Sequence, residues 1–105
     1  MTGNKLILTT SGSREEAQRI ARALVERRLA ACVNIVPQIE SIYRWKENIE
    51  QADEWLLLIK TTTSAFEHVR DAIKELHSYQ LPECICLDIE DGSAEYLKWL
   101  GGSVR

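Results

Sequence analysis

His68 and His77 are the two histidines of this 105-residue chain, and imidazole is both a common metal ligand and a side chain that titrates near neutral pH. They stand nine positions apart on a predicted helix, which at ~3.6 residues per turn places them on opposite faces. One metal site within a single chain therefore cannot use both. We expect His68 to face solvent, because it lies off the apolar stripe of the helix. For His77 two interpretations stay open, an imidazolium cap at the helix C-terminus or a ligand.

The three cysteines lie on two predicted strands. Cys84 and Cys86 share one face of their strand, about 6–7 Å apart. Cys32 belongs to the opposite edge of the predicted sheet, roughly 14 Å away. No zinc-type spacing is present, so we expect each to behave as a small buried hydrophobic residue. An odd number of cysteines cannot all pair within the chain, which favours reduced thiols and a cytoplasmic protein.

Glu54 and Lys60 lie on the same face of one predicted strand, about 20 Å apart. They cannot pair with each other, so each needs another partner. Either each charge reaches solvent at an end of the strand, or the two side chains form walls of a polar cleft.

Several function classes are disfavoured by composition and motifs. The chain has 13 basic and 16 acidic residues, interspersed, with a net charge of −3 and a pI near 5.4, which argues against nucleic-acid binding. Its apolar runs are far shorter than the ~20 residues of a membrane span, and its first residues do not resemble a signal peptide. There is no phosphate-binding glycine loop and no nucleophile elbow, so we do not expect an enzyme.

Seven elements are expected to position these side chains. They are a strand at 5–10, a helix starting at Ser13, an extended segment at 30–45, a strand at 53–61, a helix from Ser64 to near His77, a strand at 83–89, and a short helix that is capped by 91–93 and ended by 101–102. Both longer helices open on a predicted capping box, formed by Ser13 with Glu16 and by Ser64 with Glu67. Their apolar stripes need a sheet beneath them. The stripes comprise Ala17, Ile20, Ala21, Leu24 and Val25 in the first helix, and Phe66, Val69, Ile73 and Leu76 in the second.

The extended segment at 30–45 alternates as a strand does. Its apolar residues occupy odd positions: Val33, Ile35, Ile39, Tyr43 and Trp45. Pro37 lacks an amide hydrogen, which predicts an edge strand or a bulge there. A polar hairpin turn follows between 45 and 50, and Asn48 is expected to take the left-handed conformation in it.

The order β-α-β-β-α-β with a C-terminal helix predicts a ferredoxin-like α+β fold in one domain, residues 1–105. Two helices cover only one face of a four-stranded sheet. The strand at 53–61 is nevertheless apolar on both faces, and the segment at 30–45 exceeds the ~5–6 residues of a typical strand. A partner subunit is the simplest cover for the second face.

Five stretches of the chain, taken together and in this order, resemble the CutA family of divalent-ion tolerance proteins. They are Leu29-Ala30-Ala31-Cys32-Val33-Asn34-Ile35, Tyr43-Arg44-Trp45, Glu54 with Lys60-Thr61, His77-Ser78-Tyr79-Gln80-Leu81-Pro82-Glu83, and Tyr96-Leu97-Lys98-Trp99-Leu100. The resemblance covers nearly the whole chain. It implies a ferredoxin-like subunit in a homotrimer, similar in architecture to the trimeric PII signalling proteins.

The resemblance also implies a polar cleft between subunits. Its lining would be Cys32, Asn34, Tyr43, Trp45, Glu54, Lys60, Tyr79 and Glu83, with His77 as the metal ligand. We therefore expect a cytoplasmic homotrimer that binds divalent metal, copper being the expected ion, without turnover. Two alternatives stay open: a PII-like regulator that binds a small anionic molecule with Lys60 as counter-charge, and a trimeric scaffold.

Overall fold

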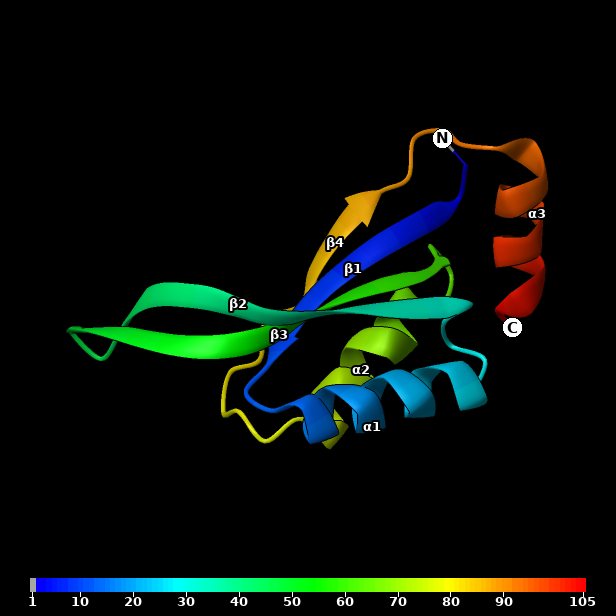
Figure 1. Ribbon diagram of the computed structural model, residues 1–105. Coiled ribbons are helices and arrows are strands. Elements are labelled where there is room, and N and C mark those ends of the chain that lie inside the picture. Colours follow the sequence, from blue (N-terminus) through cyan, green and yellow to red (C-terminus); the bar gives the residue numbers. More distant parts are fainter. Residues whose placement is uncertain (1) are drawn as a thin grey trace.

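The computed structural model describes residues 2–105, which form a four-stranded antiparallel sheet and three helices (Figure 1). The elements are β1 (Asn4–Ser11), α1 (Arg14–Glu26), β2 (Cys32–Trp45), β3 (Asn48–Thr62), α2 (Phe66–Leu76), β4 (Ile85–Asp88) and α3 (Ala94–Ser103). The strand order is β2-β3-β1-β4. This order confirms the predicted ferredoxin-like α+β fold, in which β2 and β4 are opposite edges.

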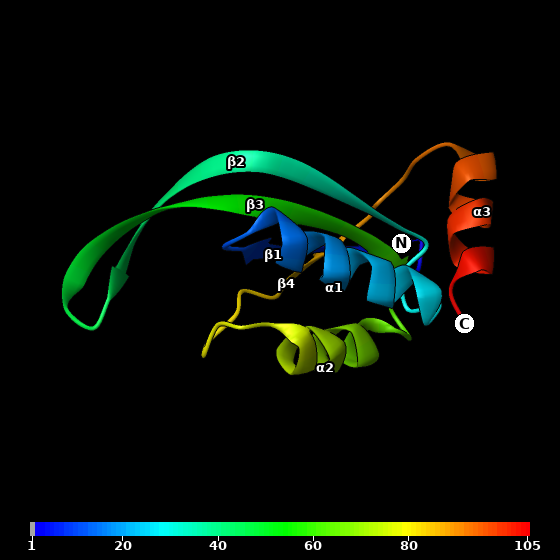
Figure 2. The same cartoon turned by 60° about the horizontal axis from the view of Figure 1, so that its bottom comes forward.

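Helices α1 and α2 lie on the same side of the sheet (Figure 2). Between them and the sheet is the core, made of Ile7, Ala17, Ile20, Leu24, Ala30, Leu57, Ile59, Val69, Ala72 and Ile73. The predicted apolar stripes therefore face this core, as amphipathic helices do. Val25 departs from the prediction, because it is 42% exposed.

The helix ends differ from the predicted capping boxes. At α1 the hydroxyl of Ser13 accepts a bond from the amide of Glu16 at 3.1 Å, but the Glu16 carboxylate bonds elsewhere. At α2 the prediction is wrong: the residue before the helix is Ala65, which has no side-chain cap, and the Ser64 hydroxyl lies 3.2 Å from that of Thr62. The third helix begins at its predicted cap, Ser93, but it continues through both glycines instead of ending at them.

The hairpin of β2 and β3 extends beyond the other two strands, because β1 pairs with β3 only from Trp55 to Thr62 (Figure 1). We call its free part, from Ile39 to Glu54, the arm. The turn at its tip consists of Lys46 and Glu47, with φ of 49° and 71°, as in the two-residue turns that match strand twist. The left-handed residues are therefore these two, whereas Asn48 is paired with Trp45 in the ladder.

A β-bulge at Pro37 and Gln38 confirms the expected irregularity in β2. Gln38 has a φ of 51°, and the pairing register shifts by one residue between Val36 and Ile39. Odd-numbered residues therefore change faces along β2. Val33 and Ile35 face the helices, whereas Ile39, Tyr43 and Trp45 lie on the opposite face. The odd positions of these five residues therefore correspond to two different faces of the sheet, on either side of the bulge.

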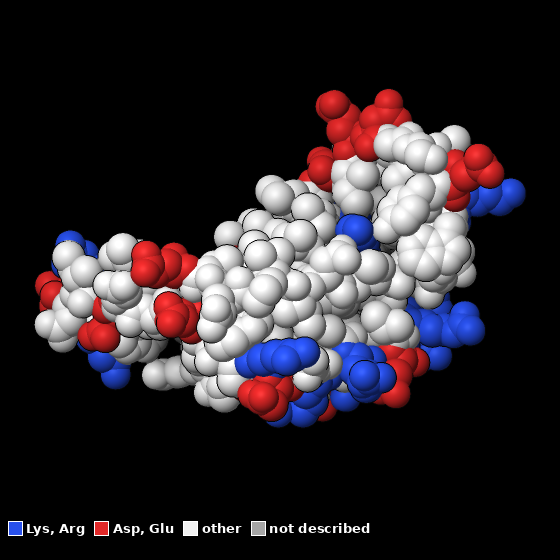
Figure 3. All heavy atoms as spheres, viewed as in Figure 1, with Lys and Arg blue, Asp and Glu red and all other residues white. Residues whose placement is uncertain are grey.

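The sheet face opposite α1 and α2 is uncovered over most of its area. Its apolar residues are Leu6, Leu8, Val36, Leu56, Leu58, Ile85 and Leu87; Ile85 and Leu87 are 47% and 45% exposed. Helix α3 stands across one end of the sheet (Figure 2). In the view of Figure 3, charged side chains gather at the arm tip, along the helix layer and near α3, and the surface between them is largely uncharged. No helix within residues 2–105 is long and apolar enough to cross a membrane.

Candidate functional site

Five of the predicted site residues line one groove along the arm, from Glu54 at its base to Trp45 beside the tip turn. Tyr43, Trp45, Glu54, Tyr79 and Glu83 line a groove of about 780 Å³, which we call the arm groove. The rest of its lining is Thr10, Ile39, Glu40, Ser41, Ile42, Leu56, Gln80 and Leu81. The groove thus combines three carboxylates with three large aromatic rings and has no Lys, Arg or His in its lining.

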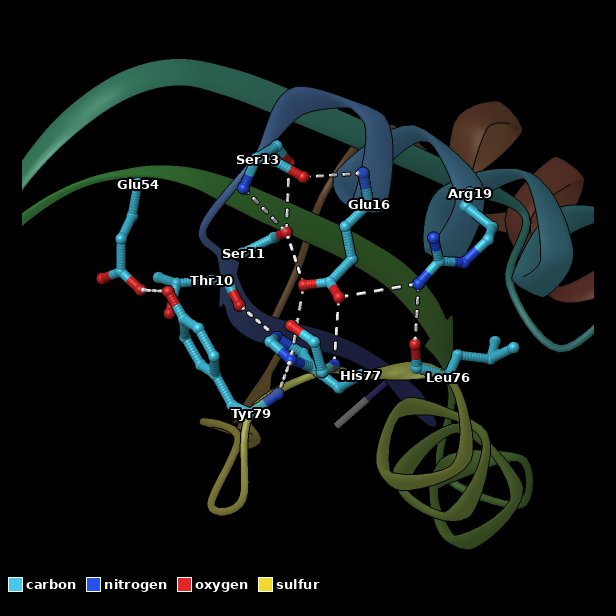
Figure 4. Close-up of polar contacts among 10 residues, drawn as sticks. Thr10, Ser11, Ser13, Glu16, Arg19, Glu54, Leu76, His77 and Tyr79 are labelled. Atoms are coloured by element: carbon cyan, nitrogen blue, oxygen red, sulfur yellow. Dashed lines mark hydrogen bonds and ion pairs between the residues drawn. The ribbon is translucent and has the colours of Figure 1, made fainter.

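The bulge in β2 and the loop after α2 together build the arm groove. Because of the bulge, Tyr43 and Trp45 share the face of β3 that carries Glu54. The loop brings Tyr79 to this face, and its hydroxyl donates to Oε2 of Glu54 at 2.7 Å (Figure 4). Burial, together with the Glu54 carboxylate, raises the pKa of Tyr79. The phenol is therefore a fixed donor to Glu54, which is 6% exposed.

Glu83 is the half-buried carboxylate of the groove that lacks a partner, whereas Glu40 is exposed to solvent. Within residues 2–105 its carboxylate takes part in no hydrogen bond or ion pair. Burial first, and then the negative charge of Glu54, raise the pKa of Glu83. A cation placed beside Glu83 and Glu54 would stabilise the charge of both carboxylates.

His77 is buried behind the groove and is held by two hydrogen bonds (Figure 4). Its ring is 0% exposed, with Nε2 2.6 Å from the carbonyl oxygen of Thr10 and Nδ1 accepting from the amide of Tyr79 at 3.0 Å. Because Nδ1 accepts from an amide, these contacts assign a ring proton to Nε2, which donates to the Thr10 carbonyl oxygen. The ring thus links β1 to the following loop. His77 is the C-cap residue of α2 through its backbone amide, which donates to the carbonyl oxygen of Ile73, and its ring takes no part in that cap. A metal ion at either nitrogen would have to displace one of these bonds, so the geometry favours a structural role, and ligation by His77 stays a prediction.

Glu16 is a buried carboxylate beside His77 (Figure 4). It accepts from the Ser11 hydroxyl at 2.9 Å and from the amide of Ser78 at 3.0 Å, and the ring of His77 lies 3.5 Å away. Desolvation opposes its charge, but these hydrogen bonds outweigh burial and lower the pKa of Glu16. One carboxylate therefore ties α1, β1 and the loop together.

The remaining predicted residues, Cys32, Asn34 and Lys60, lie elsewhere on the uncovered face. Cys32 is opposite Lys60 in the ladder, and its thiol lies 3.8 Å from Oδ1 of Asn34. The Lys60 ammonium donates to the hydroxyl of Tyr96 on α3 at 3.3 Å and lies 5.6 Å from that ring's centre. The structure therefore separates the predicted site into two groups, at opposite ends of one sheet face.

Metal-ligating side chains do not converge in the part of the subunit that the structure describes. Residues 2–105 contain no group of three or more His, Cys, Asp or Glu placed to hold a metal ion. Cys84 and Cys86 pack against the core, and burial raises the pKa of both thiols. A metal site of higher coordination would therefore need ligands from more than one chain.

Two residues that contact the predicted site residues or their loop were missed from the sequence. Tyr96 belongs to a stretch that carries the resemblance, but nothing in the sequence places it against Lys60. Glu16 did carry a signal, because it precedes Ile20 and Leu24 at intervals of four and so lies on the apolar stripe of α1. A carboxylate on a buried stripe needs hydrogen-bond donors from other elements.

The fold and the site together define a class, a ferredoxin-like α+β protein with a long hairpin arm and an acidic groove along that arm. A family model described as CutA1 divalent ion tolerance protein matches residues 5–103. The divalent-cation tolerance protein CutA of Thermus thermophilus is 52% identical over 96 residues, which cover 91% of this chain and 93% of that protein. The chain therefore belongs to the CutA1 divalent ion tolerance family.

Other relatives extend the comparison. Human protein CutA is 46% identical over 91 residues, which are 87% of this chain but 51% of the human protein. Among solved structures, that of the Thermus thermophilus protein has a TM-score of 0.95 at 49% identity, covering 97% of this chain and 99% of that one. The structure named as the periplasmic divalent cation tolerance protein CutA of Archaeoglobus fulgidus has a TM-score of 0.94 at 43% identity, with the same coverage.

Proposed function

We propose that this protein is a homotrimer that binds divalent metal, copper first, at a cleft to which the arm groove belongs. The names of its relatives connect the family with tolerance of divalent cations. The proposal includes binding without turnover, and a cytoplasmic location, which the three free thiols support.

One observation carries this function: the arm groove presents carboxylates with no basic residue to neutralise them. Glu83 has no partner of its own and is the best-placed oxygen ligand. Cu²⁺ accepts mixed nitrogen and oxygen ligands and stands at the top of the divalent affinity order. Because the ligands of one chain are too few, the remaining ligands would come from a neighbouring subunit.

Titration calorimetry with Cu²⁺ tests this proposal. We expect saturable binding by the wild type and binding about tenfold weaker, ~1.4 kcal/mol, in Glu83→Gln. Glu90→Gln removes an equal charge from an exposed site outside the groove and should leave the affinity unchanged. His77→Ala tests the ligand that the resemblance implies. A wild type without saturable copper binding would contradict the metal function.

A second candidate keeps the trimer but replaces the metal by a small anionic molecule near Lys60. The observation in its favour is that Lys60 lies beside the ring of Tyr96, which packs against Trp99 with centroids 5.4 Å apart. A thermal-shift screen of nucleotides and carboxylates, repeated on Lys60→Ala, distinguishes the two, since a bound ligand raises the melting temperature. A screen without any shift would leave the metal function as the better account.

A further inference from the structure

Lys60 is the one cation that the described strands present on the uncovered sheet face, according to the register of residues 4–88. Its ammonium bonds only to the hydroxyl of Tyr96, and within residues 2–105 it forms no ion pair. An ammonium on an apolar surface is strongly stabilised by a carboxylate once water is excluded. Lys60 therefore lacks the partner it would need if this face were covered.

The arm groove has the opposite imbalance of charge, because its carboxylates lack a cation. Its lining includes Glu40, Glu54 and Glu83, with no basic residue. Glu54 has the Tyr79 hydroxyl as a donor, but Glu83 has none, and its raised pKa reflects burial beside a second carboxylate. The rings of Tyr43 and Tyr79 beside these carboxylates also suit an ammonium, because the faces of aromatic rings attract cations.

Lys60 cannot neutralise the carboxylates of the arm groove in its own chain. Glu54 and Lys60 lie on the same face of β3, six residues apart, which corresponds to about 20 Å along a strand. Between them the face is apolar, with Leu56 and Leu58. A copy of this chain laid against that apolar surface could bring its own Lys60 to the groove.

We propose that Lys60 of a neighbouring copy enters the arm groove and pairs with Glu83, with Glu54 behind it. The Lys60 side chain of each subunit then lies in the arm groove of the next subunit, and its own groove holds Lys60 of the previous one. Such a head-to-tail contact closes into a ring when the rotation between copies allows it. This inference rests on the proposed homotrimer. At Glu83 it competes with the metal function, because the Lys60 ammonium and a divalent cation would neutralise the same carboxylate.

Subunit exchange between two isotope-labelled samples, followed by native mass spectrometry, tests the pairing. We compare the wild type with Lys60→Met, with Glu83→Gln and with the variant that has both changes. Each single change should speed exchange by about tenfold, because losing one partner of a buried charge pair acts mainly on dissociation. The double variant should exchange about as fast as the single ones, since the same pair is lost only once. Lys98→Met, an exposed lysine on α3, is the charge-matched control and should exchange like the wild type.

Other outcomes separate this inference from the proposed function. If the exchange rate of the double variant rises by the product of the two single increases, Lys60 and Glu83 do not pair, and the proposed trimer is unaffected. If the wild type is a single chain at micromolar concentration, both the inference and the proposed trimer fail. The reciprocal variant Lys60→Glu with Glu83→Lys guards against misfolding, because it restores slow exchange only if these two side chains meet across subunits.

Discussion

At the scale of single residues, the site depends on carboxylates whose environments differ. Glu16 is buried and accepts hydrogen bonds from β1 and from the loop after α2, so its charge stabilises the junction of α1, β1 and the loop. Glu83 is half-buried and has no hydrogen-bond donor, so its carboxylate can pair with a cation from outside the subunit. The same side-chain chemistry therefore serves structure at one position and, in the function that we propose, binding at the other, according to the hydrogen bonds that the fold supplies.

Replacement of Glu16 by Gln tests the structural carboxylate. We expect the free energy of unfolding at pH 7 to fall by about 2 kcal/mol, since hydrogen bonds to a charged group are lost. Glu16 has a folded-state pKa below its ordinary value of 4.5, so its contribution is present above that pH and is lost as the pH falls through the folded pKa. The difference between variant and wild type should therefore shrink in acid.

Urea unfolding at pH 7 and in acid, at one protein concentration, measures this difference. Glu15→Gln is the matched control, because Glu15 is the exposed neighbour in the same first turn of α1 and meets the same helix dipole. An equal loss in both variants would mean that the dipole, and not the buried network, accounts for the effect.

At the scale of elements, α3 shows that a glycine pair need not end a helix. Gly101 and Gly102 lie within α3, and its last turn is held against the sheet by the fully buried Leu100. The tertiary contact therefore outweighs the low helix propensity of glycine, which costs about 1 kcal/mol per residue relative to alanine.

Glycine-to-alanine substitutions at two positions should have opposite signs. In Gly102→Ala the new Cβ meets nothing within 4 Å, so we expect stabilisation by about 0.5–1 kcal/mol through helix propensity and a less flexible unfolded chain. In Gly3→Ala the new side chain also has space, but φ is +78°, so we expect destabilisation by about 1 kcal/mol. Thermal unfolding of both variants checks the signs, and a loss in Gly102→Ala would contradict the propensity argument.

At the scale of the whole molecule, the uncovered sheet face dominates. Half-exposed leucines lie on it between the arm groove and Lys60. An apolar surface of this kind favours association, because water is released when a second copy covers it. The arm, which no other strand of the subunit pairs with, gives that copy a further surface to contact.

Leu58→Glu places a carboxylate in the middle of this face, opposite Leu8 in β1. A lone chain can hydrate the new charge, whereas a subunit interface would bury it without a partner at a cost of several kcal/mol. We expect sedimentation to show a folded single chain in place of the wild-type oligomer. Ala94→Glu, which adds the same charge at an exposed position of α3, should keep the wild-type mass, and an unchanged mass in Leu58→Glu would contradict the interface.

The sequence by itself determined the order of elements, the buried stripes of α1 and α2, the irregularity at Pro37 and the isolation of Glu54 from Lys60. These features follow from local periodicity and from distances along one element, which a sequence states directly. The family resemblance added the set of polar residues, without their arrangement.

Only the tertiary structure decided which of those residues meet. The extra residue at Gln38 moves Tyr43 and Trp45 to the face of Glu54, and the numbering along β2 does not reveal such a shift in advance. The hydrogen bonds of His77, the burial of Glu16 and the contact of Lys60 with Tyr96 join segments far apart in the chain. Such pairings depend on how the elements pack, and so lie beyond any pattern of neighbouring residues.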